Sequence, residues 1–351
     1  MSGFDKATAN EVYYDVSAET VEMCADEYVA ISTEAWVTTP LNTDAGSFSL
    51  DAQCWNAGPC MLTETTLGPT VFDIQPVHLD NEGPIIVFEK VLAGFEYSDR
   101  VGGDIYYGPG PIYVLGHKQR GRSIGTRMTM QEFYVPRGMV GFTPEKQAPN
   151  TVIHPPSLIG RIVHAEWEAA FNSAKNSRGK LSSHVFERLA AAIKISLGVN
   201  PRREDVRNQS RELLFREIQR FIVTNLDSPD LSVDLVLAQH GVSRASLYRM
   251  FDSYGGIRTY ITNLRASKAM IGIWQNATQR GIVQSMQTQW AFKSGNDFNR
   301  TVRRLFGNTP KRLISRALSE PQNDDLAAGF SRNFILQRWS GVSEGPTGAF
   351  T

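Results

Sequence analysis

LSVDLVLAQHGVSRASLYRMF, the stretch from Leu231 to Phe251, decides how the C-terminal part of the chain folds. Ser232 can cap a short helix, Gly241 can supply a tight turn, and Ser243 can cap a second helix. Asp234 falls in the first turn of the first helix, where the helix dipole favours a negative charge. This spacing predicts a helix–turn–helix, in which the second helix can enter the major groove of DNA.

The second predicted helix has two chemically different faces. The apolar face is expected to pack, and it carries Leu247, Met250, Phe251 and Tyr254. The opposite face is expected to meet solvent or DNA, and it carries Arg244, Ala245, Tyr248, Arg249 and Asp252.

A related pattern, AFKSGNDFNRTVRRLFGNTPKRL, runs from Ala291 to Leu313. Ser294 can cap a helix, Gly307 can end it, and Pro310 can begin the next one. The expected packed face carries Phe298, Val302, Leu305 and Phe306, and the other face carries Gly295, Asn296, Asn299, Arg300 and Arg303. Between the two units, residues 260–271 predict a rigid connecting helix.

Three segments together resemble the AraC/XylS family of transcriptional regulators. They are Ser-x-x-x-Leu-Tyr-Arg-x-Phe at 243–251, Leu264-Arg265 with Lys268-Ala269 in the connecting helix, and Asp-Phe-Asn-Arg-x-Val-x-Arg-x-Phe-Gly-x-Thr-Pro at 297–310. This resemblance covers residues 211–318. Gly103-Asp104 and Val135-Pro136-Arg137 more weakly resemble the cupin-like sensor domain of the same family.

The resemblance implies that two helix–turn–helix units of one chain read adjacent major grooves on one face of double-stranded DNA. The base-reading candidates by position are Arg244, Ala245 and Tyr248 in the first unit and Gly295, Asn296 and Arg300 in the second. Arginine can bind guanine with two hydrogen bonds, and asparagine can bind adenine in the same way. The candidates for phosphate contacts are Arg249, Lys293 and Arg303. The expected partners are promoter or operator DNA, a second copy of the chain, RNA polymerase and a small-molecule effector.

The chain departs from the family pattern at four positions. Leu237 and Gln287 stand where the family has a small alanine at the contact between the two helices, and Ala291 stands where it has the turn glycine. Ile282 stands where a capping serine is common. Three of these four positions are in the second unit, which is therefore the less typical one, and Gly295 brings no side chain for base reading.

Charge is distributed unevenly along a chain with no net charge. Residues 201–320 hold 19 basic and 10 acidic residues, whereas residues 1–99 hold two lysines, no arginine and 17 acidic residues. A basic module on an acidic body indicates a polyanionic partner for the module, although a solvated basic surface gives the same pattern. The hydrophobic fraction of 41% and charged fraction of 21% exclude a low-complexity or mainly disordered chain.

The 351 residues are expected to form an α+β multidomain protein. Short apolar stretches broken by turn residues predict a mostly β domain, a barrel or a sandwich, and the family resemblance implies a cupin-like sensor domain at 1–156. A helical dimerisation element is expected at 157–198, a polar linker at 199–210, the double helix–turn–helix domain at 211–320, and a tail at 321–351.

Two helices are expected near 157–175 and 182–197, because apolar residues recur there at helical spacing. Leu158, Ile162, Ala165 and Ala169 form the first series, and Val185, Leu189, Ile193 and Leu197 the second. The sequence leaves two interpretations open: a helical hairpin packed on the β domain, or a dimerisation element.

Trp55, Tyr106, Tyr107 and Tyr113 are candidates to line an effector pocket, with core packing as the alternative. For a carboxylate effector the nearby cation candidates are Arg100, His117, Lys118, Arg120 and Arg122. Two other classes of function stay open: a cupin-type metalloenzyme with a helical scaffold, and a regulator controlled by a protein or peptide signal.

The sequence gives no signal for a cofactor or a metal site. The six histidines show no ligand spacing typical of a metal centre, and no catalytic residues or enzyme activity are expected. Cys54 and Cys60 are expected to be unpaired thiols rather than a redox pair. No apolar run reaches the length of a membrane helix and no signal peptide precedes residue 15, so we expect a cytoplasmic protein with no membrane contact.

Overall fold

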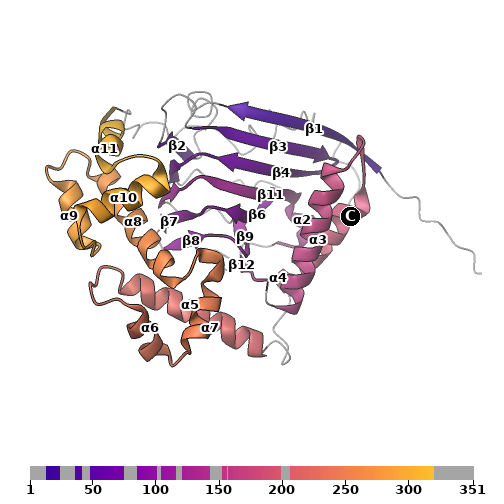
Figure 1. The fold of residues 1–351 in the computed structure, drawn as a ribbon. Coiled ribbons are helices and arrows are strands. Elements are labelled where there is room, and N and C mark those ends of the chain that lie inside the picture. Colours follow the sequence, from indigo (N-terminus) through magenta and orange to yellow (C-terminus); the bar gives the residue numbers. More distant parts are fainter. Residues whose placement is uncertain are drawn as a thin grey trace, which may run out of the picture.

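The computed structural model describes residues 13–23, 36–41, 48–74, 85–100, 104–115, 121–142, 152–155, 157–198 and 206–319. Two antiparallel β-sheets occupy the middle of the molecule (Figure 1). A helical hairpin lies at one end of the sheets, and a larger helical module lies at the other. The expected α+β class is confirmed.

The larger sheet has the strand order β12-β9-β6-β11-β4-β3-β1-β13. Its strands are β1 (Tyr13–Met23), β3 (Leu50–Ala57), β4 (Cys60–Leu67), β6 (Ile85–Ala93), β9 (Ile112–Leu115), β11 (Met128–Pro136), β12 (Val152–Ile153) and β13 (Lys180–Ser182). The smaller sheet has the order β2-β5-β10-β7-β8. Its strands are β2 (Trp36–Pro40), β5 (Thr70–Ile74), β7 (Glu96–Arg100), β8 (Ile105–Tyr107) and β10 (Gly121–Gly125).

Both faces of the larger sheet are covered, which explains the pattern of apolar residues along β11. Phe133 and Val135 belong to the core under the helical hairpin, whereas Met130 packs in a second cluster with Leu50 of β3 and Phe72 of β5. Because successive side chains of a strand point to opposite faces, one strand serves both layers.

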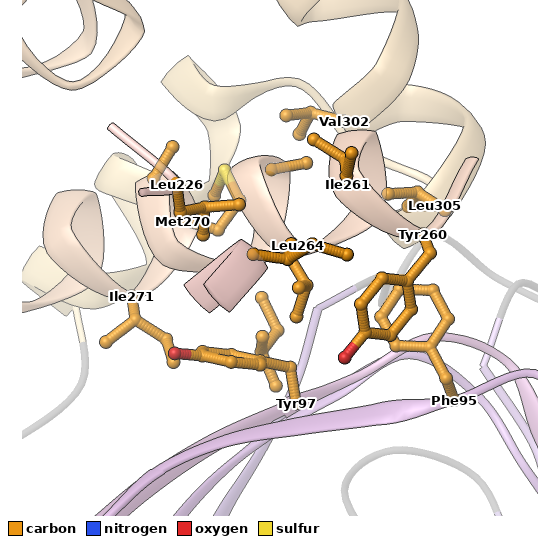
Figure 2. Close-up of a cluster of buried hydrophobic side chains, with 14 of the residues drawn as sticks. Phe95, Tyr97, Leu226, Tyr260, Ile261, Leu264, Met270, Ile271, Val302 and Leu305 are labelled. Carbon is orange, nitrogen blue, oxygen red and sulfur yellow. The ribbon is translucent and has the colours of Figure 1, made fainter. Parts of the chain in front are cut away.

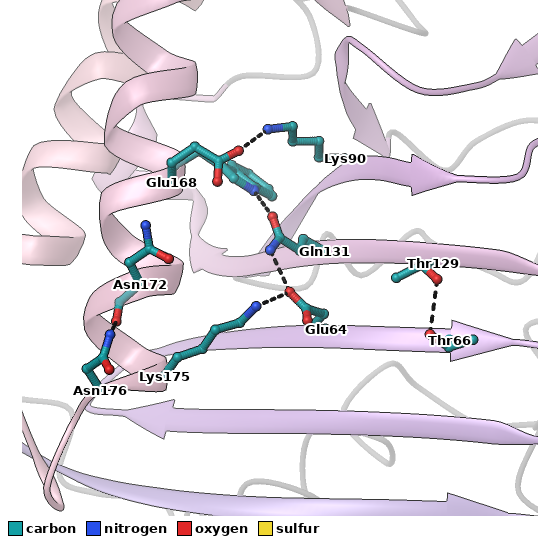
Figure 3. A network of polar contacts seen from close by, with 10 residues as sticks. Glu64, Thr66, Lys90, Thr129, Gln131, Glu168, Asn172, Lys175 and Asn176 are labelled. Carbon is teal, nitrogen blue, oxygen red and sulfur yellow. Dashed lines mark hydrogen bonds and ion pairs between the residues drawn. The ribbon is translucent and has the colours of Figure 1, made fainter. Parts of the chain in front are cut away.

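The helical hairpin consists of α3 (Leu158–Lys175) and α4 (Ser183–Gly198), close to the ranges expected from the sequence. Trp167 of α3 stacks on Phe171 and meets Phe133 of β11 edge to face. Figure 3 shows the polar network beside this core, in which Trp167 Nε1 donates to Gln131 Oε1 at 2.8 Å. Gln131 Nε2 in turn donates to Glu64 at 2.7 Å. The hairpin is therefore held by aromatic packing and by a connected buried network. A short helix, α2 (Arg137–Val140), lies beside α4.

The expected first apolar series turns out to lie on the outer face of α3. Leu158 and Ile162 are 54% and 47% exposed, and Ala165 and Ala169 are exposed as well. The buried face of α3 is instead formed by Val163, Trp167, Ala170, Phe171 and Ala174. Helix α3 is thus apolar on two sides.

The C-terminal module begins with α5 (Val206–Thr224) and is organised around α8 (Ile257–Gln275). Its other elements are α6 (Val233–His240), α7 (Arg244–Met250), the 3-10 helix η2 (Asp252–Tyr254), α9 (Ile282–Gln289), α10 (Gly295–Phe306) and α11 (Pro310–Ser319). Eleven residues of α8 are buried, which makes this helix the centre of the module.

The module and the smaller sheet share one hydrophobic core. Figure 2 shows Phe95, directly before β7, and Tyr97 of β7 directed at α8, beside Tyr260, Leu264 and Ile271. Tyr106 of β8 stacks on Phe95 at 4.8 Å and packs against Tyr254 and Tyr260 at 5.4 and 4.9 Å between ring centroids. The sheet and the helices therefore cannot separate without exposing this aromatic cluster to water.

Polar contacts reinforce the same interface. Lys268 of α8 lies 2.8 Å from Asp104 Oδ2 and 3.9 Å from Asp99 Oδ2, and its ammonium faces the rings of Tyr97 and Trp290. Asn308 Nδ2 donates to the Leu41 carbonyl at 2.6 Å. These bonds tie α8 and the segment after α10 to residues that flank β8 and β2 of the smaller sheet.

Candidate nucleic-acid interface

Helices α6 and α7 form the first predicted unit with the caps expected from the sequence. Ser232 Oγ accepts from Leu235 N, Ser243 Oγ accepts from Ser246 N, and Gly241 lies in the left-handed region with φ 61°. Because each serine satisfies a free N–H of the first turn, both helices start at defined residues. The turn between the helices is therefore fixed locally.

The two faces of α7 differ as expected. Leu247 and Phe251 are fully buried, Tyr254 is 8% exposed and Met250 is half-buried. The opposite face is exposed and carries Arg244, Ala245, Tyr248, Arg249 and Asp252. Helix α7 thus packs by one side and leaves a cationic, aromatic side free for a partner.

Helices α9 and α10 form the second unit. Ser294 Oγ accepts from Asp297 N, and Gly307 ends α10 in the left-handed region with φ 72°. The expected packed face is buried, and it consists of Phe298, Val302, Leu305 and Phe306. Asn296, Asn299, Arg300, Arg303 and Arg304 line an open hollow on the opposite side, while Lys293 is exposed and Gly295 is half-buried.

The departures in the second unit have structural counterparts. Helix α9 starts at Ile282 without a side-chain cap, and Ala291 adopts φ 52°, the left-handed conformation that a glycine takes without strain. A β-carbon at Gly295 would lie 3.3 Å from Gln287 Oε1. The side chain of Gln287 therefore lies close to Gly295, which has no side chain to crowd it.

Helix α8 positions the two units. Arg265 fixes the preceding segment, because its Nε and Nη2 donate to the carbonyls of Leu226 and Ser228 at 2.9 and 2.6 Å. Arg304 of α10 donates to Asn263 Oδ1 of α8 at 3.2 Å. Bonds from the first half of α8 therefore reach both the segment before α6 and helix α10.

Acidic side chains hold the two arginines predicted to read bases. Arg244 Nη2 donates to Asp234 Oδ1 at 2.5 Å, across the turn between α6 and α7. Arg300 Nη2 donates to Asp297 Oδ1 at 2.8 Å, within the first turns of α10. All four side chains are at least 41% exposed, so these pairs contribute little to stability.

The four aromatic candidates for an effector pocket lie in three different clusters. Trp55 packs edge to face on Phe171 under the hairpin, and Tyr106 belongs to the shared core with α8. Tyr107 and Tyr113 contact each other at 4.9 Å in a third cluster. The structure therefore does not bring the four together, and their role in holding an effector stays a prediction.

Of the cation candidates, Arg122 is half-buried. The other candidates lie outside the described part of the structure: the side chain of Arg100, and the whole of His117, Lys118 and Arg120. The tail from residue 320 and most of the linker lie outside it as well. Cys54 and Cys60 are not joined to each other, because they are buried in separate clusters on opposite faces of the sheet. Burial raises the pKa of the Cys60 thiol to about 12, which keeps it protonated.

Within the described ranges, no group of three metal-binding side chains comes together. Nor is any described helix long and apolar enough to cross a membrane.

Sequence reasoning missed the polar side of the interface between sheet and module. Lys268 was recognised only as part of a motif, and its partner Asp104 lies 164 positions earlier. Burial in this interface raises the pKa of Tyr260 well above its usual value and that of Tyr254 to about 12, so both hydroxyls stay neutral. The only signal in the sequence was the density of tyrosines at 106–113 and 248–260.

Comparison with known proteins gives similarities of structure only. No family model matches the chain, and no curated protein matches its sequence. The AraC-like transcriptional activator CuxR superposes with a TM-score of 0.42 and 16% identity, over 72% of this chain and 95% of that one. ToxT from Vibrio cholerae O395 gives 0.28 and 11%, over 75% and 99%. An oxalate decarboxylase from Bacillus subtilis gives 0.19 and 11%, over 35% and 32%.

Proposed function

We propose that the chain is a sequence-specific DNA-binding transcriptional regulator of the AraC/XylS type. The observation that carries this proposal is the arrangement of α7 and α10. Both are serine-capped helices with a buried apolar face and an exposed face that includes an arginine. Helix α10 packs on α8, and α7 joins the same core through Phe251, whose ring lies 5.0 Å from that of Tyr260 of α8. An exposed helix face with arginine and asparagine side chains has the chemistry for reading base edges in a major groove.

The length of α8 supports a two-groove reading. Its 19 residues span about 28 Å at 1.5 Å per residue. Successive major grooves on one face of DNA are about 34 Å apart. A helix of this length can hold two units at a separation close to that of adjacent grooves, with Arg249, Lys293 and Arg303 available to phosphates.

Binding of duplex DNA by the full chain tests the proposal. The probes are fragments from upstream of the gene and a random duplex, each titrated across salt concentrations. A preference for one fragment is expected, and Arg244→Ala and Arg300→Ala should each weaken that preferred binding by about 1–3 kcal/mol. Arg188→Ala, on the distant helix α4, is the matched control and should bind like wild type. Equal affinity for every duplex, or no effect of both variants, would contradict the proposal.

The expected homodimer has a candidate surface on α3. Leu158, Ile162, Ala165 and Ala169 form an exposed apolar row, and Ile195 of the adjoining helix α4 is 52% exposed. We infer that a second copy of the chain binds this surface. A dimeric DNA-binding protein contacts two half-sites at a regular spacing, so a pair of chains matches such a DNA site better than a single chain does. Ile162→Asp should shift the full chain from dimer to monomer in analytical ultracentrifugation, whereas Arg161→Asp on the same helix tests whether added charge alone has this effect.

The sheets at 1–156 are the part left for sensing an effector, and a regulator of this kind acts in the cytoplasm together with RNA polymerase. An effector would shift the population of arrangements in which the two reading faces are presented. No enzyme activity is part of the proposal. Thermal stabilisation of the full chain by a small molecule would identify an effector of that class, and a tightly bound metal after purification would instead favour an enzyme.

A further inference from the structure

Acidic residues are few in the part of the helical module that follows Asp230. Residues 231–319 contain thirteen basic residues but only three acidic ones, Asp234, Asp252 and Asp297. Two of these three bond to the two arginines that carry the proposed base reading. A carboxylate on a surface that meets phosphates opposes binding, so its presence there needs a reason.

The stability of the fold does not explain why the two aspartates bond to these arginines. Exposed ion pairs contribute about 0–1 kcal/mol, and both of these pairs are exposed. Asp234 and Asp297 also lie in the first turns of α6 and α10, where each gains a similarly small amount from the helix dipole. Neither effect requires that the partner be a base-reading arginine.

The geometry of the hydrogen bonds leaves the arginines able to act. In each pair a single nitrogen, Nη2, donates to a single carboxylate oxygen. A guanidinium has five N–H donors, of which the pair uses one. Two donors on one edge remain for O6 and N7 of a guanine, so the carboxylate and the base can be bound at the same time.

The same arrangement arises twice in different ways. In the first unit the aspartate precedes its arginine by ten residues and reaches it across the turn. In the second it precedes the arginine by three residues on one helix. Two unrelated local geometries that produce the same Asp–Arg contact on the two proposed reading faces argue for a shared purpose.

We propose that Asp234 and Asp297 are specificity-determining positioning residues, which hold Arg244 and Arg300 for guanine and away from the DNA backbone. The proposal rests on the proposed function. A long, unpaired arginine can swing to the nearest phosphate of any sequence, whereas a tethered one contributes mainly when a guanine lies within its reach. The preferred duplex should therefore contain one such guanine in each of two adjacent major grooves.

The test compares wild type, Asp234→Asn, Asp297→Asn and the control Asp252→Asn as full chains. Asp252 is the remaining acidic residue at 231–319, and it is exposed on η2. The probes are the duplex that wild type selects from a random pool, the same duplex with 7-deazaguanine at each guanine in turn, and an unselected duplex. Removal of N7 deletes one of the two acceptors that arginine uses.

For each of the two positioning variants we expect the ratio of selected to unselected affinity to fall about 5–10-fold. Affinity for the unselected duplex should rise, and the penalty for 7-deazaguanine at one position should shrink. Asp252→Asn should keep the wild-type ratio and penalty. Thermal melting of each free variant shows that a loss of ratio does not come from unfolding.

Two results would overturn the inference, and they are distinguishable. If wild type itself does not prefer the selected duplex, the proposed function fails and this inference fails with it. If wild type discriminates but the two positioning variants keep its ratio and its 7-deazaguanine penalty, the function stands and the positioning role is wrong. If both variants instead bind all duplexes more tightly by the same factor, the aspartates act only by repelling phosphates, and the positioning role is likewise wrong.

Discussion

The backbone strain at Ala291 can be tested by exchanging alanine and glycine between the turns of the two units. Ala291 is the only residue other than glycine with a positive φ in the part of the chain that the structure describes. Gly241 occupies the corresponding turn of the first unit at φ 61°, close to the 52° of Ala291. We therefore expect Ala291→Gly to stabilise the protein and Gly241→Ala to destabilise it.

The magnitude follows from two opposing terms. The left-handed conformation costs a residue with a β-carbon about 1–2 kcal/mol. Glycine loses about 0.4–1 kcal/mol more than alanine in chain entropy on folding. A β-carbon at Gly241 would meet nothing within 4 Å, so no packing term intervenes there. The net expectation is about 0.5–1 kcal/mol in each direction, with opposite signs.

Urea unfolding of the full chains, followed by far-ultraviolet circular dichroism, measures both changes. Ala191→Gly on the exposed side of α4 is the control, and it should lose about 0.5–1 kcal/mol because its helical backbone gains nothing from glycine. If Ala291→Gly is destabilised like this control, Ala291 stores no strain and the reasoning is refuted.

Three further outcomes follow from the structure. Burial, assisted by Arg216 for His154 and by Lys90 for His164, lowers the pKa of both histidines from 6.5 to about 4. Between pH 6.5 and 4 the unfolded chain therefore binds more protons than the folded one, so the free energy of unfolding should decline as the pH falls through this range. Unfolding curves measured across the range should show a smaller decline for His164→Gln than for wild type. Trp167→Phe removes the donor to Gln131 Oε1 and should cost about 1–3 kcal/mol in urea unfolding; a smaller loss would mean that the buried network is replaceable. Tyr106→Ala removes a ring from the core shared by the smaller sheet and the module, and should lower the free energy of unfolding by about 3–5 kcal/mol, as other large aromatic truncations do. Proteases should also cleave this variant faster between the two parts. Cleavage at the wild-type rate would argue against a shared core.

The sequence by itself determined the local structure of the helix pairs α6–α7 and α9–α10. Ser232, Ser243 and Ser294 act through bonds to residues three positions ahead, and Gly241 and Gly307 act through their own φ angles. Such interactions span only a few residues, so a linear pattern contains all the information that they need. The buried faces of α7 and α10 followed from helical periodicity for the same reason.

Tertiary structure decided what periodicity could not. Helix α3 has apolar residues on two sides, and only the position of Phe133 on the neighbouring sheet selects Trp167 and Phe171 as the buried side. Lys268 finds Asp104 across 164 positions, and Tyr106 finds Tyr260 across a comparable distance along the chain. Contacts between residues so far apart depend on how whole layers stack, and no local pattern encodes that stacking. The sequence thus specified where α7 and α10 begin and which of their faces is buried, while the packing of the sheets against α8 decided how the module is held.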